Sequence, residues 1–107
     1  MNFRLQRIND LLREEISKII LKEIDFENNC IVTVTRADTA PNFSKSKIFF
    51  TVIPETKEKY VLSQIKNNIY DIQKIINKKL KMKYVPRLFF EIDTGAKNLY
   101  KIDKFCH

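Results

Sequence analysis

The sequence predicts an α+β fold with the element order helix, strand, strand, helix, helix, strand. Apolar residues recur at intervals of three and four in residues 3–24 and 58–82, which is the spacing of one face of a helix. In residues 30–38, 44–54 and 84–93 apolar and polar residues alternate, as in a strand with one covered face. Together these patterns predict a three-stranded sheet with helices packed on one face.

The first predicted helix carries a continuous apolar stripe, which we expect to pack on the sheet. The residues of this stripe are Leu5, Ile8, Leu12, Ile16, Ile19, Ile20 and Ile24. Basic residues lie outside the stripe, and three glutamates balance their charge. The polar face of this helix is therefore either solvated or part of a surface for an anionic partner. The basic residues are Arg4, Arg7 and Arg13.

The next two segments predict an antiparallel pair of strands. In residues 30–38, CIVTVTRAD, Val32 and Val34 lie on one side, and Thr33 and Thr35 lie on the other. The break at TAPN leaves a connection of about six residues, which favours antiparallel pairing. In residues 44–54 the predicted inward residues are Ile48, Phe50 and Val52, and the outward residues are Lys45, Lys47, Phe49 and Thr51.

The stripe in residues 58–82 is too long for one straight helix over this sheet. A helix of 25 residues would extend roughly 37 Å, whereas strands of eight residues extend only about 26 Å. We therefore expect a bend or break at residues 67–70, where Asn67 and Asn68 can cap or turn the chain. The stripe itself consists of Leu62, Ile65, Ile69, Ile72, Ile76 and Leu80.

The last predicted strand is YVPRLFFEID, residues 84–93. Pro86 is tolerated because it lies at the start of the strand. The alternation places Leu88, Phe90 and Ile92 inward and Arg87, Phe89 and Glu91 outward. We expect one domain, residues 1–107, with a flexible tail from about residue 96, since a chain of this length can bury one core.

Scarce residue types exclude several kinds of site. Gly95 is the only glycine, so a Walker loop, a dinucleotide fingerprint and a GxxG clamp are all excluded. The only histidine is the terminal His107, and Cys30 and Cys106 lack metal-site spacing. We expect both cysteines to be reduced, with Cys30 packed. We predict no metal, no cofactor and no catalysis, and the lack of a long apolar run predicts a cytoplasmic protein.

The net charge of +7 is unevenly distributed. Residues 42–54 and 74–87 contain basic residues and no acid, and outside them basic and acidic residues nearly balance. A lysine-rich composition alone would scatter acids among the lysines, so the pattern favours a polyanionic partner. The eight candidate contacts are Lys45, Lys47, Lys74, Lys78, Lys79, Lys81, Lys83 and Arg87.

The spacing of three of these lysines predicts that Lys74, Lys78 and Lys81 share a helix face that follows a phosphate backbone. On the sheet, the outward Phe49 and Phe89 either stack on bases or are covered by the tail.

The chain resembles the ribosome-binding factor A family of bacterial small-subunit assembly factors over about residues 3–103. The resemblance rests on the basic first helix, VTVT at 32–35, KIFFTV at 47–52 and, above all, KKLKMKYVPRLFFEID at 78–93. It implies a type II KH-like fold without catalysis. It also implies binding to 16S ribosomal RNA, in the small subunit or its precursor, and a role in late maturation of that subunit.

The family replaces the KH loop with an Ala-x-Gly kink, and Asn68, Ile69 and Tyr70 occupy that position here. Two further departures are Arg87, where the family usually has an acid, and Asn77, where glycine is common. From the resemblance we also expect a monomer with no membrane partner and no small-molecule substrate.

Other classes of function stay open at this point. A general single-stranded RNA or DNA module would use the same lysines together with the two outward phenylalanines. A protein adaptor is a further alternative. An enzyme is disfavoured because no spacing pairs the candidate carboxylates, which are Glu14, Glu15, Asp93 and Asp103.

Overall fold

The computed structural model describes residues 3–26 and 30–95, and its elements follow the predicted order. They are α1 (Phe3–Glu23), β1 (Ile31–Thr39), β2 (Lys45–Ile53), the 3-10 turn η1 (Glu55–Lys57), α2 (Glu58–Asn67), α3 (Ile69–Lys79) and β3 (Arg87–Ile92). Within these residues, no helix combines the length and the apolarity needed to cross a membrane.

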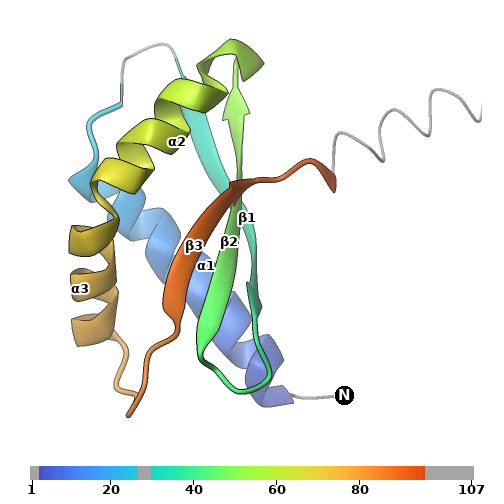
Figure 1. Cartoon of the computed structure of the whole chain (residues 1–107), viewed down its shortest axis with the longest axis vertical. Coiled ribbons are helices and arrows are strands. Elements are labelled where there is room, and N and C mark those ends of the chain that lie inside the picture. The colour runs from blue at the N-terminus through green and yellow to red at the C-terminus, as the bar shows by residue number, and fades with distance from the viewer. Residues whose placement is uncertain (1–2, 27–29, 96–107) are drawn as a thin grey trace, which may run out of the picture.

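The three strands form one mixed sheet in the order β1-β2-β3. As predicted, β1 and β2 are antiparallel, whereas β2 and β3 are parallel and begin opposite each other at Lys45 and Arg87. A parallel pair needs a long crossover, which α2 and α3 supply. Figure 1 shows α1 behind the sheet, with α2 and α3 on the side of β3.

One face of the sheet and one face of each helix form a single core. Ile48, Phe50 and Val52 of β2 are buried, as predicted, together with Leu88 and Phe90 of β3. The stripe of α1 is buried from Ile8 to Ile20, and Cys30 packs against the core. Cys106 lies outside the described residues. The α+β fold with helices on one sheet face is therefore confirmed.

A β-bulge interrupts the alternation of β1, which the sequence pattern did not reveal. The register with β2 shifts between Val34 and Arg36, and Thr35 has no paired residue. The hydroxyl of Thr35 donates a hydrogen bond of 2.6 Å to Oδ2 of Asp93, a buried residue at the end of β3. The inward positions beyond the bulge are Ala37 and Thr39, so Arg36 faces away from the core.

The predicted break between the later helices is confirmed and lies at Asn68. This residue has a non-helical backbone, with φ −107° and ψ 7°. Its side chain donates a 2.7 Å hydrogen bond to the carbonyl oxygen of Gln64 and makes no hydrogen bond that caps α3. Asn68 therefore closes the end of α2, and each shorter helix can take its own direction over the core.

The predicted end of the last helix near Met82 is wrong, because α3 ends at Lys79. Leu80 has an extended backbone, with ψ 121°, and is buried. The chain has to turn here because β3 begins at Arg87, opposite the start of β2. Lys81 therefore lies outside the helix and does not share a helix face with Lys74 and Lys78.

We predict that Thr35→Val lowers the free energy of unfolding by about 1–3 kcal/mol, because it leaves a buried carboxylate oxygen of Asp93 without this donor. Val keeps the shape and the β-branching of Thr. Thr33→Val is the matched control, since Thr33 is exposed on the same strand. Urea titrations that gave both variants the same midpoint would contradict this role of Thr35.

Candidate nucleic-acid interface

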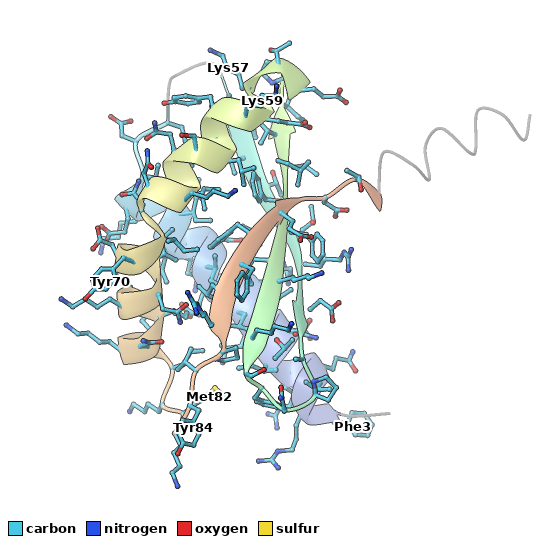
Figure 2. All side chains as sticks on the ribbon, viewed as in Figure 1. Phe3, Lys57, Lys59, Tyr70, Met82 and Tyr84 are labelled. Carbon is cyan, nitrogen blue, oxygen red and sulfur yellow. The ribbon has the colours of Figure 1, made fainter. Side chains whose placement is uncertain are left out.

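Basic residues from separate elements meet at one end of the molecule. The start of α1, the β1–β2 loop and the link at residues 80–86 surround one groove. Arg4, Lys81 and Lys83 line this groove, together with Ser44 of the loop. Figure 2 shows Tyr84, from the same link, at the end of the molecule opposite Lys59.

The sheet register adds two more cations to this end. Lys45 and Arg87 are the first residues of the parallel strands β2 and β3 and lie directly opposite each other. Both are exposed, and the backbone N–H of Arg87 donates to the carbonyl oxygen of Ser44 at 3.1 Å. Residues 42–45 of one acid-free segment and 81–87 of the other therefore form one surface. We call this surface the basic end and define it as Arg4, Lys45, Lys81, Lys83 and Arg87.

Most of the basic end carries uncompensated charge. Within residues 3–26 and 30–95, no carboxylate oxygen lies within 4.0 Å of the cationic nitrogens of Lys45, Lys81, Lys83 or Arg87. Arg7 lies beside it, in a second groove that also contains Arg4 and one acid, Asp10. The surface is therefore electrostatically complementary to a polyanion.

The other four predicted contacts do not join the basic end. Lys74 and Lys78 are exposed on α3, on the side away from its buried residues. Two others have acidic neighbours: Nζ of Lys79 lies 3.7 Å from Oε2 of Glu15, and Nζ of Lys47 lies 4.0 Å from Oε1 of Glu91. Ion pairs near the surface contribute little stability, but they reduce the charge available to a partner.

The open face of the sheet pairs arginines with the two outward phenylalanines. The guanidinium of Arg36 lies 3.8 Å from the ring centroid of Phe49, and that of Arg87 lies 5.7 Å from the centroid of Phe89. Phe49 is partly buried and Phe89 is exposed. Sequence reasoning missed Arg36, because only the bulge turns it to this face; a bulge leaves no sequence signal here.

The predicted kink residues border a different groove. Ile69 and Tyr70 line a space of about 460 Å³ between α3 and β3, together with Phe89. Asn68, which makes the break, is half-buried and is not part of this lining. The groove beside the kink therefore lies at the β3 edge of the sheet. Val85 of the 80–86 link also lines this groove.

Gln73 fixes the link that carries Lys81 and Lys83. Its Oε1 accepts the backbone N–H of Leu88 at 2.9 Å, and its Nε2 donates to the carbonyl oxygen of Pro86 at 3.1 Å. Both backbone groups lie where β3 begins, on the edge of the sheet. One side chain of α3 thus holds the end of the link in place.

The described residues offer no metal site, since no three His, Cys, Asp or Glu residues come together among them. Glu14 and Glu15 both lie near Nζ of Lys18, at 3.9 and 3.8 Å, and Asp93 accepts hydrogen bonds from Thr35 and from the backbone N–H of Gly95. Asp103 and His107 lie outside the described residues.

The comparisons with known proteins identify one and the same family. A family model described as ribosome-binding factor A matches residues 4–106. The ribosome-binding factor A of Chlamydia pneumoniae is 32% identical over 95 residues, covering 86% of this chain and 79% of that protein. That of Caldanaerobacter subterraneus subsp. tengcongensis is 30% identical over 106 residues, covering 97% and 87%.

Solved structures show the same fold. The crystal structure of ribosome-binding factor A from Thermus thermophilus gives a TM-score of 0.72 at 16% identity, covering 82% of this chain and 94% of that chain. A homology model of the Thermus thermophilus protein, fitted into a cryo-EM map of a 30S complex, gives a TM-score of 0.59 at 15% identity, covering 79% and 94%.

We predict that Gln73→Met loosens the start of β3, because it removes both hydrogen bonds to the backbone while keeping the side-chain length. Hydrogen exchange at the amide of Leu88 should become at least about tenfold faster, the equivalent of ~1.4 kcal/mol. Gln64→Met is the control, since Gln64 is a partly buried residue of α2 distant from the link. Unchanged protection of the Leu88 amide would show that the hydrogen bonds of Gln73 do not stabilise the start of β3.

Proposed function

The chain belongs to the ribosome-binding factor A family, and from that premise we propose that it is a non-catalytic ribosome assembly factor. It binds the small ribosomal subunit or its precursor through phosphates of 16S ribosomal RNA and assists late maturation of that RNA. The fitted 30S complex of the Thermus thermophilus relative supports the choice of partner. The observation that carries the proposal is the basic end, where cations from α1, both parallel strands and the 80–86 link converge.

The structure supports different roles for the predicted contacts. Lys45, Lys81, Lys83 and Arg87 are exposed on the basic end, and each phosphate that they neutralise releases counterions. Lys74 and Lys78 offer separate contacts on the outside of α3. Lys79 and Lys47 contribute less, because a phosphate has to compete with the glutamate beside each of them.

The remaining features of the proposal follow from the family and the sequence. The protein acts in the cytoplasm as a monomer, as one KH-like domain over residues 1–107 with a tail from about residue 96. The kink at Asn68, Ile69 and Tyr70 stands in place of the KH loop. We propose no cofactor, no membrane partner and no small-molecule substrate.

A general single-stranded RNA or DNA module is the second candidate, and the exposed ring of Phe89 beside Arg87 favours it. We predict that purified small subunits compete with an unstructured RNA of about 20 nucleotides for the protein at physiological salt and bind at least about tenfold more tightly. A competition titration by fluorescence anisotropy measures this ratio. Equal affinities would favour the general module.

We predict that the double variant Lys81→Glu and Lys83→Glu lowers affinity for small subunits by a factor on the order of 100, because each charge-assisted contact contributes about 1.5 kcal/mol. Sedimentation of the protein with purified subunits measures the loss. The matched control reverses two exposed lysines of α2, Lys59 and Lys66, away from the basic end.

The two double variants change the net charge equally, so a non-specific effect of charge would weaken both. Circular dichroism checks that both remain folded. Loss of binding in the first variant alone supports the basic end as the contact surface, whereas equal binding by both would refute it.

A further inference from the structure

An apolar floor lies among the cations of the basic end. Two adjoining grooves, of about 690 and 620 Å³, share Phe43 and Met82 as well as Arg4. Phe43 comes from the β1–β2 loop and Met82 from the 80–86 link, and both are partly buried against the core. Lys81, Lys83 and Tyr84 also line the larger groove. This groove has the size of sites that bind small ligands, about 300–1,000 Å³.

Phe43 is held in this position by a strained backbone. Its φ of 61° is the only positive value at a non-glycine residue in the described part of the chain. The loop is closed by a hydrogen bond of 2.9 Å from the N–H of Ala40 to the carbonyl oxygen of Lys45, and the N–H of Phe43 donates to the carbonyl oxygen of Ala40 at 2.8 Å.

Such a conformation is unfavourable for a bulky residue and suits glycine or asparagine. Asn42, the preceding residue, instead uses its side chain to accept hydrogen bonds from the N–H and the hydroxyl of Ser44. The loop thus places a phenyl ring at the groove at a cost in backbone strain. Strain of this kind clusters at ligand-binding sites.

Tyr84 adds a second aromatic ring that packing does not explain. This residue is 72% exposed, and its side chain projects from the end of the molecule, as Figure 2 shows. Nζ of Lys83 lies 5.7 Å from the ring centroid, so a cation and a π face are presented together. Aromatic rings between cations are the arrangement that binds single-stranded nucleic acid by base stacking.

We propose that one unpaired nucleotide of the RNA seats its base in this groove, against Phe43, Met82 and Tyr84. Arg4, Lys81 and Lys83 then contact the phosphates on either side of it. This inference rests on the proposed function and deepens it, since it adds a base contact to phosphate contacts that carry no sequence information. This nucleotide belongs to a single-stranded region, because the faces of bases in a duplex are covered by the neighbouring base pairs.

The test compares Tyr84 with a second large, exposed side chain. Tyr84→Ala should weaken binding to small subunits between about 5- and 100-fold, the range for one stacked base, whereas Leu21→Ala should change it less than about twofold. Leu21 is the control because it is 70% exposed and lies near the end of α1, whereas Arg4 of the basic end lies at the start of that helix. Tyr84→Phe should restore binding, because it keeps the ring.

Phe43→Gly extends the test to the floor of the groove. Glycine accepts the positive φ, so the loop keeps its conformation while the ring is lost. We expect weaker binding, with an unchanged dependence of log Kd on log salt concentration, because the phosphate contacts remain. Ultraviolet crosslinking of wild-type complexes, with the attached base mapped by mass spectrometry, should identify Tyr84 or Phe43.

The outcomes separate this inference from the proposed function. A wild-type protein that does not bind small subunits would refute both. If the wild-type protein binds, full binding by Tyr84→Ala and Phe43→Gly would overturn the base site alone, as would an equal loss for Leu21→Ala. Displacement of the subunits by a polyglutamate peptide as effectively as by RNA would also overturn it, because it would assign the groove to an acidic protein.

Discussion

The parallel pairing of β2 with β3 is the constraint on which the rest of the structure depends. It places Lys45 opposite Arg87 and thereby brings together two segments that are distant in the sequence. Parallel strands cannot be joined by a tight turn, so the chain between them has to cross over the sheet. α2 and α3 form that crossover, and their lengths and the break between them follow from it. The basic end exists because both parallel strands begin at the same end of the sheet.

The parallel pairing limits the length of the crossover helices and leaves backbone groups of β3 unpaired. The break at Asn68 meets the first constraint, and the hydrogen bonds of Gln73 meet the second. A straight helix would overrun the sheet, whereas α2 and α3, at about 15 and 16 Å, each fit within the roughly 30 Å of a nine-residue strand. β3 is an edge strand, and its exposed backbone groups need partners. Gln73 supplies them at Pro86 and Leu88. The same contacts position the link that carries the cations, so the fold and the candidate site share one set of hydrogen bonds.

Local pattern was sufficient to predict the elements but not the contacts between them. The apolar stripes of α1 and α3 and the alternation around Phe50 depend on neighbours in the sequence, so the sequence displays them directly. The bulge at Thr35 and the acidic neighbours of Lys47 and Lys79 depend on residues brought close only by folding. Runs without acids showed where charge accumulates along the chain, but they did not show which lysines share a surface.

The distribution of acidic residues over the surface indicates that the basic end binds an anionic partner. This fold places a carboxylate near a lysine at Glu15 and at Glu91, yet none lies within 4.0 Å of Lys81 or Lys83 among the described residues. Repulsion between exposed cations is weakened by salt, over a Debye length of about 8 Å at physiological ionic strength, so the free protein tolerates it. A bound polyanion both attracts these charges and relieves their repulsion. In the proposed base site, the apolar floor beneath them would stack on an unpaired base, an interaction that salt does not screen. The two parts of the surface would then supply attraction at long range and selectivity for single-stranded RNA at contact.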